Sequence, residues 1–472
     1  MMQDGGNAFD AAAAASFVLS VVQPHLSGLG GDFFGLFYEG ATGRVHCLNG
    51  SGWSPASSSL EKTLSNHGHV PRFGHASVVV PGCVQGVYSM HKKFGRLPFA
   101  KTVARAIGLA DGGFPVGTGV LVSLSRLKGE LPPSVHRTFM PSGQVPSVGS
   151  VLRQRQLAVT LREIAERGAD GFYRGRPAEA IIREMSSGGA EFDHSDFSSF
   201  TAEWCEPLRS TYRGTEVFEV PPNSMGATTL LILKLLEGAD LSSLGANSGG
   251  RVAAMVEAAR QAYGARDREL GDPRFSRFRL EDFLLSGKES GNQARMDKAD
   301  TTYFSVADEE GNLLSCIQSI FFNFGSRVFV EDGGFFLNNR GSAFSIRGPN
   351  RLEPRKRPLH TLSALILSKG GEPIVATGAS GGEFRPQQHA LFATNIVDYG
   401  MGVEQALDYP RFLWDGDEVI VEKGYGDLSG SGLKIRQVGY PGPTGVAQGV
   451  QVLEKAVKGV CDVRGEGFPA GE

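Results

Sequence analysis

The chain has 472 residues, of which 41% are hydrophobic and 21% are charged, and its formal net charge is −3 at pH 7. These values are ordinary for a globular protein with a large core. Near-neutral charge without a long basic run argues against nucleic acid as the main partner, because phosphate binding needs clustered Lys and Arg. The densest basic segment, residues 351 to 357, is expected to be a solvated loop.

Other classes of protein are disfavoured by short-range features of the sequence. No stretch reaches the roughly 18 to 20 apolar residues of a membrane span, so no membrane partner is expected. The five cysteines are odd in number, widely spaced and free of any CxxC pair, and no histidine ligand set accompanies them. Neither a disulfide framework, a metal site nor another cofactor is therefore predicted. The absence of a visible signal peptide favours a cytoplasmic location.

Apolar periodicity predicts the elements in chain order. The first part is expected to contain a helix over 8 to 22, glycine-rich turns over 27 to 31 and strands near 33 to 38 and 44 to 48. The turn ending at Asp32 lacks the Lys-Ser/Thr end of a phosphate loop, so it is interpreted as structural. The middle is expected to be mostly helical, with helices over 152 to 166, 177 to 185, 226 to 236 and 251 to 266.

The second half of the chain changes character. From 274 to 300 charge rises and apolar order falls, which is typical of a mobile linker. Strands are then predicted over 301 to 307, 313 to 322, 335 to 338, 362 to 368 and 373 to 377, and a helix over 385 to 399. Composition and periodicity by themselves support an α/β or α+β fold.

Thr301 is the most informative residue, because it opens a strand directly after the expected linker. A threonine hydroxyl is a poor nucleophile without a base, but an N-terminal threonine carries one in its own α-amine, whose pKa is about 8. Cleavage between Asp300 and Thr301 would expose that amine. From spacing alone, the simpler interpretation is a β-branched residue that only pairs and packs.

Several further motifs occur in one order along the chain. They are Gly5-Gly6-Asn7-Ala8-Phe9-Asp10-Ala11-Ala12, Gln23 to Asp32, Val80-Pro81-Gly82, Phe94 to Pro98, Gly168 to Tyr173, Pro221 to Gly226, Arg266 to Pro273 and Gly333 to Gly341. Together with the strand at Thr301, they resemble the gamma-glutamyltranspeptidase family of N-terminal nucleophile hydrolases nearly end to end.

The resemblance implies an α+β fold, the four-layer αββα sandwich of N-terminal nucleophile hydrolases. It also implies autocleavage into a large subunit, residues 1–300, and a small subunit, residues 301–472, which together form one heterodimeric unit. Members of the family usually have a strand and a helix before the Gly-Gly-Asn segment, whereas this sequence begins four residues ahead of it. Either the start codon is misassigned or that strand is missing, so the localisation is left open.

The resemblance also assigns catalytic roles. The family's nucleophile matches Thr301, so the precursor bond would join Asp300 and Thr301. The family's oxyanion amides match Gly381 and Gly382, in a glycine-rich turn that precedes a predicted helix and can therefore aim backbone N–H groups at developing negative charge. A hydroxyl near the nucleophile matches Ser319. From the residues alone, a plain strand-to-helix turn and a serine bonded to backbone are the alternatives.

The expected substrate pocket departs from the family pattern. The usual arginine before an Ala-Pro pair is absent from residues 50 to 55, an asparagine is replaced by Phe321, and the final acid of the Asn-Asn motif is replaced by Ala343. The substrate-binding candidates at the remaining family positions are Asn339, Arg340, His360 and Thr361. Arg340, His360 and Arg385 would together favour an acyl group that bears a carboxylate but no α-amine. A solvated surface role is the alternative for Arg340 and His360.

Three functions are compatible with the sequence. The first is an autoprocessed hydrolase or transferase that cleaves γ-glutamyl amides such as glutathione through an acyl-enzyme and passes the acyl group to water or an amine. The second is an acylase for another carboxylated acyl amide, of the glutaryl type. The third is an unprocessed, inactive homologue with a binding role.

Overall fold

The computed structural model describes residues 1–287, 301–454 and 456–471, which form two compact units. Unit 1 consists of Met1–Phe34, Leu48–Trp204 and Gln318–Pro358. Unit 2 consists of Gly35–Cys47, Cys205–Ile317 and Leu359–Glu472. Each unit therefore combines chain from before and after Thr301.

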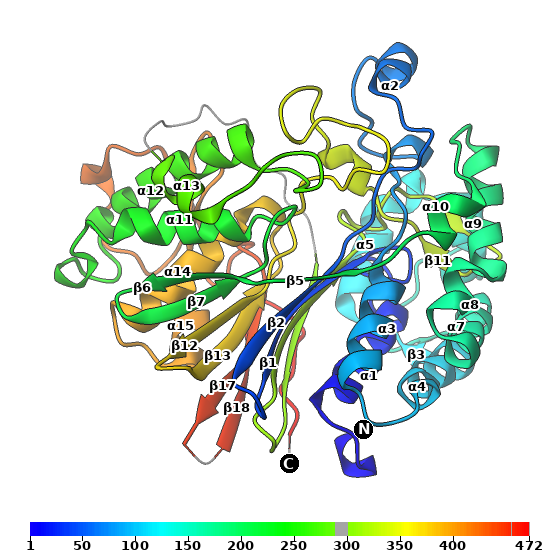
Figure 1. Cartoon of the computed structure of the whole chain (residues 1–472), viewed down its shortest axis with the longest axis horizontal. Coiled ribbons are helices and arrows are strands. Elements are labelled where there is room, and N and C mark those ends of the chain that lie inside the picture. The colour runs from blue at the N-terminus through cyan, green and yellow to red at the C-terminus, as the bar shows by residue number, and fades with distance from the viewer. Residues whose placement is uncertain (288–300, 455, 472) are drawn as a thin grey trace. The chain divides into compact units, whose positions relative to one another are not determined.

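Unit 1 is mostly helical. Its helices are α1 (Ala8–Val22), α2 (Leu60–His67), α3 (Cys83–Phe94), α4 (Phe99–Gly112), α5 (Thr118–Leu127), α6 (Pro133–Phe139), α7 (Arg155–Arg167), α8 (Ala169–Tyr173), α9 (Arg176–Ser187) and α10 (His194–Ser198). Two short strand pairs accompany them, β3 (Phe114–Pro115) with β4 (Val151–Leu152), and β10 (Phe329–Val330) with β11 (Phe335–Phe336). In Figure 1, α1 lies beside α3 and α4, and α4 also packs against α7.

The start of α1 follows from a capping box. The Asn7 side chain accepts hydrogen bonds from the backbone N–H groups of Phe9 and Asp10, and an Asp10 carboxylate oxygen accepts from the Asn7 N–H at 2.9 Å. These bonds satisfy N–H groups that a helix start otherwise leaves without partners. The helix predicted over 8 to 22 is confirmed, and its buried face holds Ser16, whose hydroxyl donates to Gln318 at 2.5 Å.

A five-stranded sheet has the order β5-β2-β1-β9-β8. Its strands are β1 (Asp32–Glu39), β2 (Arg44–Gly50), β5 (Glu203–Cys205), β8 (Thr302–Ala307) and β9 (Leu313–Ser319). The predicted strands at 33 to 38, 44 to 48 and 301 to 307 are confirmed, while β9 ends three residues before its predicted limit.

Unit 2 is built on a six-stranded antiparallel sheet of order β18-β17-β13-β12-β7-β6. The strands are β6 (Leu208–Tyr212), β7 (Thr215–Glu219), β12 (Leu365–Lys369), β13 (Glu372–Ala379), β17 (Ala447–Leu453) and β18 (Ala456–Cys461). A smaller sheet contains β14 (Phe412–Trp414), β15 (Val419–Glu422) and β16 (Ile435–Val438). The helices are α11 (Gly226–Leu236), α12 (Gly249–Glu269), α13 (Leu280–Leu285), α14 (Arg385–Val397) and α15 (Val403–Asp408).

The two faces of this sheet have different neighbours. Val375 and Ala379 of β13 belong to a hydrophobic core shared with α11, α12 and α14, which cover that face in Figure 1. Side chains alternate along a strand, so Gly378 faces the other way. Tyr303 of β8 packs there. Unit 2 therefore stacks helices, a sheet and β8 in three layers.

Two expectations about loops are wrong. The segment 274 to 300, expected as a linker, contains α13, which is anchored by the buried Phe283, and residues 288–300 of that expectation lie outside the described residues. The segment 351 to 357, expected as a solvated loop, buries Lys356 and Arg357. Arg357 reaches an internal acceptor, since its guanidinium donates to Glu203 at 2.5 Å.

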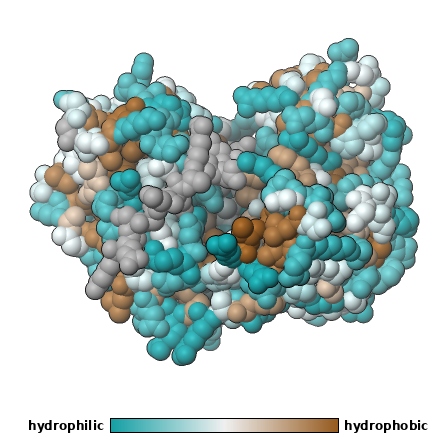
Figure 2. Space-filling view, turned by 90° about the horizontal axis from the view of Figure 1, so that it is seen from above, coloured by the Kyte–Doolittle hydropathy of each residue, from teal (hydrophilic) through white to brown (hydrophobic). Residues whose placement is uncertain are grey.

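The surface matches the composition. Figure 2 shows hydrophilic side chains over much of the visible face, with separate hydrophobic areas between them. None of the helices in the described ranges combines the length and apolar character of a membrane span.

Candidate active site

Thr301 immediately precedes β8 and is buried, with only 4% of its surface exposed. Its hydroxyl oxygen has no hydrogen-bond partner within the part of the chain that the structure describes. Buried hydroxyls almost always find such a partner. Thr301 thus combines a fixed position with a hydroxyl that no described residue engages. Asp300, the other predicted cleavage residue, lies outside the described residues.

The start of β8 is held against β13 by one ring. A methyl group placed on Gly378 would lie 2.5 Å from two ring carbons of Tyr303, so only glycine leaves room for this ring. The Tyr303 hydroxyl is 2.7 Å from the Ser315 hydroxyl, which in turn donates to the Thr377 carbonyl at 3.3 Å. Burial raises the pKa of Tyr303, so the ring remains a neutral packing element. The Tyr303 ring therefore fixes β8 at a position two residues after Thr301.

β13 ends in the predicted glycine turn. Gly381 has φ 134° and Gly382 has φ 59°, values that favour glycine. Gly381 is partly exposed, whereas Ser380 and Gly382 are buried. The hydrogen bonds of the described residues include none donated by the N–H of Gly381 or Gly382. Both N–H groups are therefore available to an external acceptor.

The start of a helix also favours an anion at this glycine turn. The short 3-10 helix Gly382–Phe384 leads directly into α14, so the turn lies at the positive end of a 13-residue helix. Partial positive charge at a helix N-terminus stabilises an anion nearby. The arrangement is compatible with an oxyanion held at these two glycines, the role that the family resemblance implies for them.

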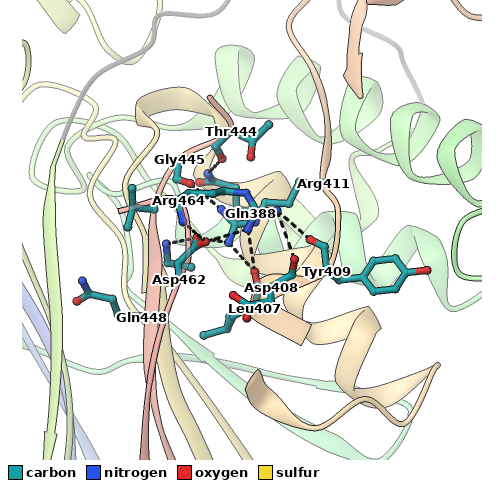
Figure 3. Close-up of polar contacts among 12 residues, drawn as sticks. Gln388, Leu407, Asp408, Tyr409, Arg411, Thr444, Gly445, Gln448, Asp462 and Arg464 are labelled. Carbon is teal, nitrogen blue, oxygen red and sulfur yellow. Dashed lines mark hydrogen bonds and ion pairs between the residues drawn. The ribbon is translucent and has the colours of Figure 1, made fainter. Parts of the chain in front are cut away.

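A second loop, residues 444–446, is hydrogen-bonded to the glycine turn. The Ser380 N–H donates to the Val446 carbonyl and the Ser380 hydroxyl accepts from the Val446 N–H, both at 2.8 Å. The Gln388 side-chain amide donates to the carbonyls of Ser380, at 2.9 Å, and Thr444, at 2.6 Å. Figure 3 shows Gln388 beside Thr444 and Gly445. The turn is thus joined to residues 444–446 by two direct hydrogen bonds and by a bridge through the Gln388 side chain.

Buried charged side chains position the loop of residues 444–446. Arg411 donates to the Gly445 carbonyl at 2.7 Å and to Asp462 at 2.5 Å, and Arg464 pairs with Asp462 at 2.9 Å and with Glu422 at 2.5 Å (Figure 3 shows both arginines). Burial raises the pKa of Glu422, but hydrogen bonds from Arg464 and Thr444 lower it by more. Burial lowers the pKa of Arg411, although its partner Asp462 opposes the shift. Sequence reasoning missed these four residues, because nothing in their local pattern distinguishes buried from solvated charge.

His360 and Thr361 lie in unit 2 and are buried. The backbone N–H of His360 donates to the Asn223 carbonyl at 2.7 Å, and the backbone N–H of Leu362 donates to the ring Nδ1 of His360 at 3.1 Å. Because Nδ1 accepts a hydrogen bond, a neutral His360 ring carries its proton on Nε2. The solvated role considered for His360 is therefore wrong.

Ser319, Asn339 and Arg340 lie together in unit 1. The Ser319 hydroxyl accepts from the Phe321 N–H at 2.8 Å, which agrees with a serine bonded to backbone. The Asn339 amide accepts from the Phe322 N–H at 3.1 Å and donates to the Arg72 carbonyl at 2.9 Å. Both side chains therefore shape the loop that follows β9.

Arg340 is fully buried, so its expected solvated alternative is also wrong. Its guanidinium lies 4.0 Å from the centroid of the Phe321 ring and 3.5 Å from a carboxylate oxygen of Asp32. Burial lowers the pKa of Arg340 to about 10, and Asp32 opposes the shift. Arg340 is therefore cationic near neutrality. Asp32 also accepts from the Gly52 N–H at 2.8 Å, so the carboxylate at the end of this turn is bonded within the protein.

Arg385, the third cation of the expected pocket, is also buried. Its Nε donates to the Ala379 carbonyl at 2.7 Å, just before the glycine turn. The site residues predicted from the sequence are thus divided between the two units. Unit 2 contains Thr301, Gly381, Gly382, His360 and Thr361, and unit 1 contains Ser319, Asn339 and Arg340.

The chain is similar in sequence and in structure to known proteins. A family model described as Gamma-glutamyltranspeptidase matches residues 1–472. The "Glutathione hydrolase-like YwrD proenzyme" of Bacillus subtilis is 36% identical over 501 residues, covering 100% of this chain and 95% of that protein. The "Glutathione hydrolase proenzyme" of Escherichia coli is 30% identical over 466 residues, covering 90% and 80%. Among solved structures, a cephalosporin acylase from Bacillus halodurans is 32% identical with a TM-score of 0.91, covering 98% of this chain and 91% of that one.

Proposed function

The chain belongs to the gamma-glutamyltranspeptidase family, and we propose that it is a self-processing threonine hydrolase or acyltransferase that cleaves γ-glutamyl amides such as glutathione. One observation carries the proposal. In a chain that the family model matches from end to end, Thr301 lies buried at the start of β8 with a hydroxyl that no described residue engages. Its named relatives are proenzymes, which agrees with activation by cleavage.

Activation is proposed to occur at the bond between Asp300 and Thr301. The Thr301 hydroxyl attacks the Asp300 carbonyl carbon, the peptide C–N bond breaks, and the resulting ester is hydrolysed by water. The products are a large subunit of residues 1–300 and a small subunit of residues 301–472, which stay together as a heterodimer. Each compact unit by itself contains chain from before and after Thr301, which supports a folded product whose fragments remain associated.

Catalysis then uses the α-amine that cleavage exposes. The amine takes the proton of the Thr301 hydroxyl while the oxygen forms a bond to the acyl carbon. The N–H groups of Gly381 and Gly382 stabilise the oxyanion, the amine returns the proton to the leaving nitrogen, and the amide bond breaks. Water or an acceptor amine releases the acyl group by the reverse sequence. Ser319 remains the residue proposed for the further hydroxyl that the family resemblance implies.

The proposed architecture is the four-layer αββα sandwich. In unit 2, helices cover one face of the six-stranded sheet and β8 packs on the other face. In unit 1, Ser16 of α1 bonds to Gln318 at the end of β9, so helices also meet the five-stranded sheet. These contacts support two sheets stacked between two helical layers.

A second candidate substrate is an amide whose acyl group bears a carboxylate but no α-amine. The similarity to a cephalosporin acylase favours it, as do Phe321 and Ala343 at family positions that would otherwise be polar. Arg340, His360, Thr361 and Asn339 remain the proposed substrate-binding residues. Arg340 would contribute its buried positive charge to the recognition of a carboxylate.

Side-by-side hydrolysis of γ-glutamyl p-nitroanilide and glutaryl p-nitroanilide tests the proposal. The proposed function predicts release of p-nitroaniline by the wild type and none by Thr301→Ala, with Thr302→Ala as the matched control in the next position of the strand. Faster cleavage of the glutaryl substrate would assign the acylase function. Equal activity of Thr301→Ala and the wild type would overturn the mechanism.

A further inference from the structure

The Gln388 side chain lies between two glycines. A methyl group on Gly381 would lie 2.7 Å from Gln388 Nε2, and one on Gly445 would lie 2.3 Å from the same atom. Both glycines have positive φ, 134° and 87°. No larger residue at either position leaves room for the amide, so the three residues form one close-packed element of unit 2. Figure 3 shows Gln388 and Gly445 side by side.

The orientation of the Gln388 amide follows from its partners. Its nitrogen lies within hydrogen-bond distance of two carbonyl oxygens, those of Ser380 and Thr444. Carbonyl oxygens only accept, so the NH2 group and not the amide oxygen must face them. Gln388 is fully buried, and water does not compete for these bonds.

Anchoring the Ser380 carbonyl also sets the direction of the next N–H group. The peptide unit between Ser380 and Gly381 is planar and trans, so its C=O and N–H bonds point in opposite directions. The Ser380 oxygen points to Gln388 at 2.9 Å. The Gly381 N–H therefore points away from Gln388, and it donates no hydrogen bond to the described residues.

We propose that Gln388 is the positioning residue of the oxyanion turn, which aims the Gly381 N–H by holding the opposite end of its peptide plane. The assignment rests on the proposed function, because it gives Gly381 a role in the reaction. Gln388 touches no reacting atom. Its contribution is greatest when negative charge develops on the acyl oxygen, so its loss lowers kcat and leaves KM nearly unchanged.

The test compares two variants on one helix. Gln388→Met keeps the length of the side chain but removes both donors. Asn395→Leu, two turns further along α14, removes another fully buried amide, which donates to the Ala406 carbonyl at 2.9 Å and does not touch the turn. For the better p-nitroanilide substrate, Gln388→Met is expected to lower kcat by roughly 10- to 100-fold, below the 10²- to 10³-fold effect of removing an oxyanion donor outright. Asn395→Leu is expected to retain kcat within about twofold.

A third variant separates positioning from packing. Gln388→Glu has the same shape, but a carboxylate has no donor for the two carbonyls, whereas a protonated carboxyl has one. Its activity relative to the wild type is therefore expected to rise as the pH falls from 8 to 5, while the relative activity of Gln388→Met stays flat.

The outcomes are distinguishable. A wild type that is active, with Gln388→Met within twofold of it or no more impaired than Asn395→Leu, overturns the role of Gln388 and leaves the proposed function intact. Loss through KM alone, or a flat relative pH profile for Gln388→Glu, also overturns it. A wild type that is neither cleaved nor active overturns the proposed function, and the role of Gln388 with it.

Discussion

Replacing Gly378 with alanine tests the packing that holds the start of β8. The new methyl carbon would lie 2.5 Å from Cδ2 and Cε2 of Tyr303, about 1 Å inside normal carbon–carbon contact. The ring cannot move freely, because its hydroxyl is bonded to Ser315 and only 4% of the residue is exposed. Overpacking of this kind costs about 1 to 3 kcal/mol. At about 2 to 4 °C per kcal/mol for a body of 150–250 residues, Tm is expected to fall by roughly 2 to 12 °C.

The assay is calorimetry in a Thr301→Ala background, which keeps every chain in one piece. Gly449→Ala on the neighbouring strand is the matched control, because its methyl group would lie no closer than 3.1 Å to any atom. Adding Tyr303→Leu to Gly378→Ala removes the overlapping ring and is expected to restore part of the lost Tm. A Gly378→Ala variant with the same Tm as the Gly449→Ala control would refute the reasoning.

Two further predictions concern buried charge. Arg464→Met leaves the buried Glu422 carboxylate without its Arg464 partner, while Asp462 keeps Arg411, and it is expected to destabilise the protein by about 3 to 5 kcal/mol, measured by thermal unfolding. The pKa of Glu422 is lowered in the fold, so its stabilising contribution is present above the unfolded pKa of about 4.3 and lost as pH falls through the folded value. The variant's Tm should therefore vary less than that of the wild type below about pH 4, and parallel curves would contradict the pairing. Arg340→Met is expected to lower kcat/KM for the glutaryl substrate by at least tenfold more than for the γ-glutamyl substrate, and equal losses would show that Arg340 serves only Asp32 and Phe321.

Long elements with strong local signals could be predicted from the sequence. α11 was predicted with its observed limits, and α1 was set by the Asn7 and Asp10 capping box. The strand at Thr301 and the turn before α14 were also predicted, because apolar alternation and paired glycines mark them locally.

Short strands and long-range contacts could not be predicted in this way. β5, β6, β7 and the strands from β14 onward were missed, since most have only three to six residues and owe their conformation to neighbours far along the chain. The burial of Arg340 depends on Asp32, more than 300 positions earlier. Likewise, no local pattern of Gln388 indicates that it reaches both Ser380 and Thr444.

The central claim is that Thr301 is the nucleophile of a self-processing enzyme, and the intact mass of the purified chain tests it most directly. We predict two fragments that meet between Asp300 and Thr301 in the wild type and in Thr302→Ala, and a single chain of 50.3 kDa in Thr301→Ala. A single uncut chain in all three proteins would contradict the claim, as would cleavage that persists in Thr301→Ala.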